Sequence, residues 1–392
     1  MPLQLSAAYA SEQRSESSLN HGSAGLVRPI RPADVMELTR LYMSVFRGRD
    51  VAPSARLQEH FRRVFIDHPR QSEECASLVY VTEAGDIGGM IGILPSPMMM
   101  DEAPITGSIV STWMTRPGPT RALAGNRLMR AHLERGHAFT IANTANSTSM
   151  AAQRMLRFRF AASHGLEWFK VLNLSAYAAS VAANRLGARL PRLLARAVHG
   201  SERGLRYALA RRDARPPAGW SVVTLSVEAF AARLVAFSQR FRFRPDWDAQ
   251  DVAWMLDLAA ERRGSGPLRL CEAVDATGRS AGVFAYYAQP FGRAEILQLV
   301  ARPRLESGVL RACIADAAGQ RCAYVCGAAE PLVVQGLFDE PAVFFRQKTG
   351  TVFRAASDEV AAAIAYGEGL AGGLVGDGWS PLATESYDEA RG

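Results

Sequence analysis

The sequence predicts an α/β protein of two domains, each a mixed sheet flanked by helices. The length of 392 residues is more than one hydrophobic core usually serves, so two or three domains are expected. Strand-like and helix-like apolar patterns alternate along the chain. The order of these patterns in the first half returns in outline in the second half, although no repeat is visible at the level of residues.

The first half begins with a short strand at 26–30, and Asp34 then caps a helix that runs to Phe46. A glycine-containing turn at 85–86 joins two apolar runs as a hairpin would. The remaining patterns predict helices at 55–66, 126–135 and 149–158, and strands at 77–82, 89–94, 105–114 and 137–142.

The second half follows a basic helical stretch at 174–212 and a boundary at Arg215-Pro-Pro-Ala-Gly219. We predict strands at 220–225, 268–274, 282–288, 294–300 and 322–326, helices at 229–241, 249–260 and 305–318, and a helix and strand after Pro331. The predicted division is a disordered tail at 1–25, a first domain at 26–172, a basic helical connector at 173–218 and a second domain at 219–392.

The composition is that of an ordinary globular protein, with 48% hydrophobic and 21% charged residues. The five cysteines are scattered, which favours a reducing compartment, and Cys322 and Cys326 are predicted to fill a core. The histidines and cysteines show no metal-ligand spacing, so no metal is expected. The first 25 residues lack a continuous apolar stretch, so neither a signal peptide nor a transmembrane segment is expected there, and a cytoplasmic location is predicted.

Positive charge is concentrated in one region of a chain whose formal net charge is +7. Arg185, Arg189, Arg192 and Arg196 recur at helical spacing and form one stripe. This stripe is either a solvated helix face or a docking surface for an acidic partner, such as a carrier protein, an anionic glycan, tRNA or a membrane surface. No DNA binding is expected.

The segment from Ser108 to Arg135 resembles the pyrophosphate-binding segment of the GNAT superfamily of acyl-CoA N-acyltransferases. A strand at 108–114, the loop Thr115-Arg-Pro-Gly-Pro-Thr-Arg-Ala-Leu-Ala-Gly125 and a helix at 126–135 follow in the family's order. In that family the loop amides and the helix N-terminus hold the phosphates of coenzyme A. The resemblance implies two tandem GNAT domains and an acetyl-CoA or other acyl-CoA co-substrate. The cofactor-binding residues that it implies in this segment are Met114, Thr115, Arg121, Ala122, Leu123, Ala124, Gly125 and Asn126.

The loop departs from the family pattern in two places. Leu123 stands where the first glycine belongs, and Thr120 stands where the Arg or Gln belongs, with Arg121 one place late. The family also uses a main-chain N–H near the strand end, here Met114 or Thr115, to polarise the thioester carbonyl. The corresponding loop of the second half, 301–308, lacks the glycine pattern, which predicts a degenerate second unit and one acyl-CoA site per chain.

Asn146, Ser149 and Gln153 fall on the family's next strand and helix. Asn146 and Ser149 are further candidates for cofactor binding, and Asn146 is equally well explained as a helix N-cap. Asn146 and Gln153 are the candidates for catalysis. Gln153 stands where many members carry the tyrosine that protonates the departing thiolate, and an amide cannot do this. No general base is identifiable, since Asp101 and Glu102 precede the strand and are equally explained as turn residues.

The leading hypothesis is direct transfer of an acyl group, with acetyl the favoured one, from acyl-CoA to the amine of a small acceptor. A Fem-like transferase that uses aminoacyl-tRNA would employ the arginine stripe. A catalytically inactive binding module with this fold would explain Leu123 and Gln153.

Overall fold

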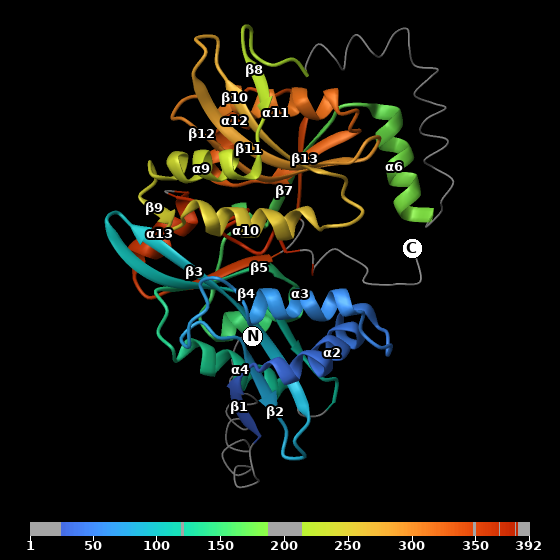
Figure 1. Ribbon diagram of the computed structural model, residues 1–392, viewed down its shortest axis with the longest axis vertical. Helices are drawn as coiled ribbons and strands as arrows, with labels where there is room; N and C mark the ends of the chain where they lie inside the picture. Colours follow the sequence, from blue (N-terminus) through green and yellow to red (C-terminus); the bar gives the residue numbers. More distant parts are fainter. Residues whose placement is uncertain are drawn as a thin grey trace, which may run out of the picture.

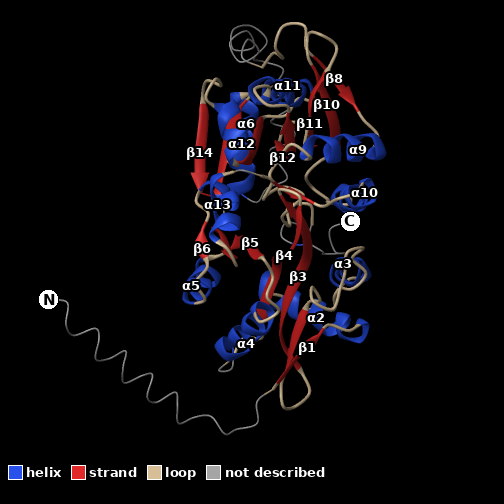
Figure 2. Ribbon diagram, turned by 90° about the vertical axis from the view of Figure 1, so that its left-hand side faces the viewer, coloured by secondary structure: helices blue, strands red, loops and turns tan. Residues whose placement is uncertain are grey.

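The computed structural model describes residues 25–118, 121–186, 214–347, 350–367, 369–380 and 382. Two sheets lie one above the other along the long axis of the molecule (Figure 1). Helices cover both faces of each sheet (Figure 2). The predicted fold class, two mixed sheets flanked by helices, is confirmed.

The first sheet has the strand order β1-β2-β3-β4-β5-β15-β6, and β9 pairs with β3 beside this path. Its pairs are antiparallel apart from β4 and β5, which run parallel. The strands are β1 (Leu26–Pro29), β2 (Leu78–Val81), β3 (Ile87–Met100), β4 (Ala103–Thr115), β5 (Phe139–Ala145), β6 (Arg159–Phe160), β9 (Phe243–Pro245) and β15 (Gly350–Ala355). The helices around it are α2 (Val35–Arg47), α3 (Ala55–Phe65), α4 (Arg121–Leu133), α5 (Ser147–Met155) and α13 (Asp358–Tyr366).

The second sheet has the order β14-β7-β13-β12-β11-β10-β8. Its strands are β7 (Leu166–Val171), β8 (Ser221–Thr224), β10 (Leu268–Val274), β11 (Ser280–Ala288), β12 (Arg293–Ala301), β13 (Tyr324–Ala328) and β14 (Val343–Gln347). Its helices are α6 (Leu174–Leu186), α9 (Val227–Ser238), α10 (Ala249–Ala260), α11 (Glu306–Gly319) and α12 (Pro331–Leu337). Strand, two helices, three strands, helix, strand and helix therefore follow one another twice, as the sequence predicted.

Strands cross between the two halves of the chain: the first half contributes one strand to the second sheet, and the second half contributes two, β9 and β15, to the first sheet. β7 belongs to the first half, yet it pairs with β13 and β14 in the second sheet. β15 belongs to the second half, yet it pairs with β5 and β6 in the first sheet. The sheets therefore do not follow the division predicted at residue 172. No strand was predicted at 166–171, and even where apolar patterning predicts a strand, it does not say beside which strand that segment pairs.

Asp34 does not cap α2 with its side chain, contrary to the prediction. Its carboxylate accepts two hydrogen bonds from Arg28, at 2.7 and 2.8 Å, and a third from the Arg31 amide at 2.8 Å. Burial by itself would raise the pKa of Asp34, but these hydrogen bonds and the two arginine charges hold the pKa below its usual value. The side chain thus fastens β1 to the turn that precedes α2.

The five cysteines are all buried and free, which confirms that Cys322 and Cys326 fill the core. Among the described residues, no group of three or more His, Cys, Asp and Glu side chains is arranged to hold a metal ion. Within the same residues, no helix is long and apolar enough to cross a membrane.

Candidate functional site

The central feature of the first sheet is the separation of β4 from β5. The two strands pair only at 107–109 and 139–141, although β4 continues to Thr115 and β5 to Ala145. The register between β3 and β4 shifts next to this point, so that Ser111 is an extra residue in β4. The β5-facing edge of β4 beyond Ile109 therefore has no strand partner in the described part of the chain.

A cavity of about 470 Å³ fills this opening, and we call it the first cleft. Residues 110–113 of β4 form one wall, and Ala142, Thr144 and Ala145 of β5 form another. The rest of the lining comes from α2, from α5 and its N-cap, from Arg262 and Glu295, and from the C-terminal residues Asp377, Gly378, Ser380 and Leu382. The cleft is large enough for part of a small organic ligand.

Asp377 is the carboxylate that stands out in the first cleft. Its residue is only 6% exposed, the Thr144 hydroxyl donates to its Oδ2 atom at 3.3 Å, and the Ser111 hydroxyl also hydrogen-bonds with it. Burial raises the pKa of Asp377 to about 6, although the two hydroxyl groups hold it lower than burial alone would. A carboxylate with such a pKa can accept a proton near neutral pH.

The C-terminal segment that carries Asp377 is held firmly in place. Leu374, Val375 and Trp379 belong to the hydrophobic core between the sheets. The Tyr42 hydroxyl donates to the main-chain oxygen of Leu382, and the Arg47 guanidinium donates to the same oxygen at 2.9 Å. Helix α2 and the core therefore position Asp377 against β4 and β5.

The structure brings three of the sequence candidates to the first cleft, namely Asn146, Ser149 and Gln153. Asn146 is the N-cap of α5, since its Oδ1 atom accepts from the Ser149 amide at 2.9 Å and from the Ser149 hydroxyl at 3.0 Å. The capping interpretation is therefore confirmed. Gln153 is 1% exposed, and its Oε1 atom has no hydrogen-bond partner among the described residues.

The other cofactor candidates lie beside the first cleft and not in its wall. Helix α4 begins at Arg121, so the residues 121–125 that were predicted to form a loop are helical. Ala and Leu are strong helix formers, and Ala124 packs on the sheet, which explains the earlier start. Arg121, Ala122, Leu123 and Asn126 are exposed on α4, whereas Ala124 and Gly125 are buried.

Gly125 faces the sheet and not open space. A Cβ atom built on it would lie 3.5 Å from the Trp113 ring and 3.7 Å from the methyl group of Thr115. Met114 is buried in the core, while Thr115 ends β4. Trp113 lines the first cleft, and its buried Nε1 atom has no hydrogen-bond partner among the described residues.

Asp101 and Glu102 form the turn between β3 and β4, at the end of the hairpin opposite to Thr115. Arg242 donates to Asp101 at 2.9 Å, and Arg244 donates to Glu102 at 3.3 Å. Their interpretation as turn residues holds, because neither of them lines the first cleft. Asp377, which does line the first cleft, lies more than two hundred residues after its hydrogen-bond partner Thr144. Nothing in the local sequence marks Asp377 as a site residue beyond the neighbouring glycines.

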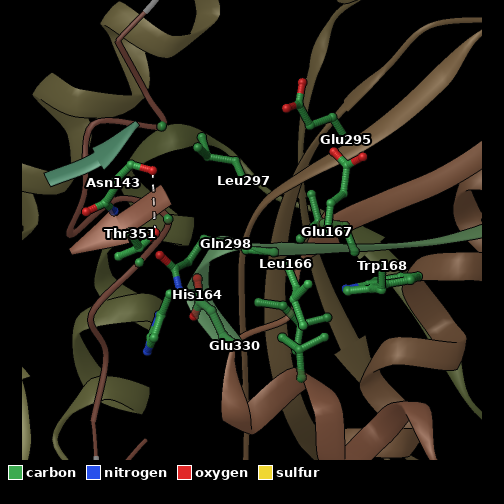
Figure 3. Close-up of a pocket in the computed structure, with 18 of the residues that line it drawn as sticks. Asn143, His164, Leu166, Glu167, Trp168, Glu295, Leu297, Gln298, Glu330 and Thr351 are labelled. Atoms are coloured by element: carbon green, nitrogen blue, oxygen red, sulfur yellow. Dashed lines mark hydrogen bonds between the residues drawn. The ribbon is translucent and has the colours of Figure 1, made fainter. Parts of the chain in front are cut away.

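The second sheet opens in the same way as the first. β12 and β13 pair only at 293–295 and 324–326, and a register shift between β11 and β12 lies next to this point. A cavity of about 170 Å³, which we call the second cleft, lies beyond the paired residues (Figure 3). Thr144, Arg262, Glu295, Asp377 and Gly378 line both clefts, so the two clefts adjoin.

No family model matches the sequence, and no curated protein matches it either. Solved structures with the same fold do match. The structure aligns over 87% of its length with 74% of a GCN5-related N-acetyltransferase from Kribbella flavida, at 15% identity and a TM-score of 0.54.

Two further solved structures match over 85% of this chain. One is a GCN5-related N-acetyltransferase from Anabaena variabilis ATCC 29413, covered over 73% of its length at 11% identity and a TM-score of 0.54. The other is a probable N-acyltransferase from Enterococcus faecalis V583, covered over 72% at 12% identity and a TM-score of 0.52. The separated central strands, the repeated element order and these alignments agree: the chain has the two-domain fold of the GNAT acyltransferases.

Proposed function

We propose that this protein transfers an acyl group, acetyl in the simplest case, from acyl-CoA to the amine of a small acceptor. The observation that carries the proposal is Asp377, a buried carboxylate at the open edge of β4. Sequence reasoning found no general base, and Asp377 supplies a group of that chemistry inside a cavity. The fold supports acyl transfer in general, and the acceptor and mechanism are inferences from the site.

The thioester would lie in the first cleft, along the β5-facing edge of β4. Main-chain N–H groups on an edge without a strand partner can donate to the thioester oxygen, on which negative charge develops during transfer. Trp113 offers a further donor without a partner among the described residues. The exposed first turn of α4, from Arg121 to Leu123, would face the phosphates of coenzyme A.

In this proposal, Asp377 carries the proton that moves from the amine to the thiolate during the transfer. The neutral amine attacks the thioester carbon, the new C–N bond forms, and the C–S bond breaks. The ionised Asp377 carboxylate takes one proton from the attacking nitrogen, and the resulting acid returns it to the thiolate. This route needs no proton donor at position 153, where the chain carries glutamine.

A catalytically inactive binding module is the second candidate, and Gln153 is the observation that favours it, because an amide cannot protonate the thiolate. Both candidates predict bound coenzyme A, whereas only the enzyme releases free thiol in the presence of an amine. The Fem-like hypothesis depends on Arg185, Arg189, Arg192 and Arg196; the side chain of the first is not described, and the other three lie outside the described residues. It therefore stays a prediction.

The experiment has two parts. Mass spectrometry of the protein purified from its host should detect bound coenzyme A or acyl-CoA. A thiol-release assay with acetyl-CoA and a panel of amines then compares the parent with Asp377→Asn and with Asp358→Asn, a matched control whose carboxylate is 93% exposed. Thiol release that depends on amine and on Asp377, but not on Asp358, supports the proposal. Bound acyl-CoA with no thiol release from any amine supports the binding module instead.

A further inference from the structure

The second cleft corresponds to the first in the repeated fold, but its size suits a different ligand. Its volume is about 170 Å³, against about 470 Å³ for the first cleft. The Leu374 amide donates to the Gln298 side chain at 2.9 Å, which holds the C-terminal segment against β12. A cavity of about 150 Å³ can hold one six-membered ring such as benzene, so the second cleft has room for a single ring and little more.

The indole nitrogen of Trp168 is a hydrogen-bond donor without a partner at this cleft. Trp168 is 0% exposed, and its Nε1 atom has no hydrogen-bond partner among the described residues. A Cβ atom built on Gly327 would lie 3.3 Å from this nitrogen. Gly327 follows Cys326, the last β13 residue that pairs with β12, so the nitrogen lies where the two strands separate. The nitrogen edge of the Trp168 ring is turned toward the cleft (Figure 3).

Arg262 supplies a second donor of the same kind. It is 6% exposed and lines both clefts. One terminal nitrogen of its guanidinium donates to Glu295 at 2.7 Å, and the guanidinium lies over the Tyr287 ring. Its Nε atom has no partner among the described residues. Buried polar groups are rarely left without partners unless a ligand or water supplies them, so the two donors indicate ligand oxygen atoms in the second cleft.

The carboxylates of the second cleft decide which kind of oxygen fits these donors. Four of them line it, namely Glu167, Glu295, Glu330 and Asp377. Arginines balance the first two, since Arg346 donates to Glu167 at 2.6 Å and Arg262 donates to Glu295. The negative charge of the other two would repel a carboxylate on the ligand. A hydroxyl group suits both kinds of partner, because its oxygen accepts from an N–H group while its proton is donated to a carboxylate.

We propose that the second cleft binds hydroxyl groups of the acceptor, and that the acceptor is an amino sugar. The hydroxyl groups accept hydrogen bonds from Trp168 and Arg262 and donate to the carboxylates, while the amino group reaches Asp377, which lines both clefts. This inference rests on the proposed function, because it names the substrate class of the same transfer site. It gives the second repeat a role in choosing the acceptor.

The test is calorimetric titration of the protein, without acyl-CoA, with ring amines that differ in their oxygen atoms. The probes are glucosamine, galactosamine and mannosamine, together with cyclohexylamine, which has no hydroxyl group, and 2-aminocyclohexanecarboxylic acid, which offers a carboxylate. At least one of the three amino sugars should bind about tenfold or more tightly than cyclohexylamine, as expected for one charge-assisted hydrogen bond.

Three variants assign this preference to the two donors. Trp168→Phe removes the indole N–H group and keeps an aromatic ring, and Arg262→Lys removes the Nε donor and keeps a positive charge beside Glu295. Each should reduce the preference for the amino sugar about fivefold or more. Trp220→Phe is the matched control, because Trp220 lines neither cleft, and it should retain the preference. Thermal unfolding of each variant establishes that it is folded.

The outcomes separate this inference from the proposed function. Equal affinity for cyclohexylamine and every amino sugar in the parent overturns the inference, and so does a preference that survives in each folded variant of Trp168 and Arg262. Tighter binding of the aminocyclohexanecarboxylic acid would assign the donors to a carboxylate and refute the amino sugar. Thiol release from acetyl-CoA with cyclohexylamine as good an acceptor as the amino sugars would leave the function intact and refute the inference. Amino-sugar binding that depends on Trp168, in a protein that binds no acyl-CoA, would support the inference and refute the function.

Discussion

Replacement of Asp377 by asparagine tests the site most directly, because it changes charge without changing shape. The buried carboxylate has a pKa of about 6, against 3.8 for a solvated aspartate. One pKa unit corresponds to about 1.4 kcal/mol, so ionised Asp377 lowers the free energy of unfolding by about 3 kcal/mol.

The sign of the pH dependence follows from the same shift. Below about pH 4 the carboxyl group is protonated in both the folded and the unfolded chain, and it has no effect on their difference. As the pH rises from 4 to 6 the unfolded chain ionises first, so the folded state loses stability. Above about pH 6 the free energy of unfolding is lower by the full amount of about 3 kcal/mol. Arg262 and Glu295, the other charged groups at the junction of the clefts, are paired with each other.

The assay is urea unfolding of the parent and of Asp377→Asn at pH 4.5, 6 and 8. We expect the variant to gain about 3 kcal/mol at pH 8 and much less at pH 4.5, while kcat/KM for acyl transfer falls about a hundredfold or more, as for a lost general base. Asp358→Asn is the control, and because it loses only an exposed ion pair with Arg159, it should lower the free energy of unfolding by about 1 kcal/mol or less and leave kcat/KM unchanged. A variant that is no more stable than the parent at pH 8, or one that keeps full activity, would refute the assignment of Asp377.

Three further predictions follow from the fold and the first cleft. Titration with acyl-CoA should give a stoichiometry near one per chain, because the second cleft is small and acidic; a value near two would contradict this. Gly125→Val should weaken acyl-CoA binding more than Gly118→Val, because its methyl groups meet the Trp113 ring that lines the first cleft; equal binding by folded variants would show that this ring does not shape the site. The fragments 25–172 and 214–392, expressed separately, should each fail to show cooperative thermal unfolding, because each lacks the strand that the other supplies; a sharp transition in either would mean that the exchanged strands are dispensable.

The pattern of apolar residues in the sequence was enough to predict the elements that the two halves share, together with their order, but not β6, β7, β9 or α13. This worked because the apolar period of a helix or strand depends on residues close in the chain. The N-cap at Asn146 could be predicted for the same reason, since its partner is Ser149, three residues away. Where a local signal misled, as for Asp34, a partner outside the helix competed for the side chain.

The tertiary structure alone decided how these elements share the two sheets and what lies in the clefts. Nothing in their local sequences assigns β7 or β15 to a sheet, because their pairing depends on the edges of β13 and β5 far away in the chain. Asp377 becomes a buried carboxylate with a raised pKa only because the C-terminal segment is packed between the sheets. By itself, the sequence determined the repeated α/β order, since that rests on local periodicity. The exchange and the site required contacts over hundreds of residues, which no local pattern encodes.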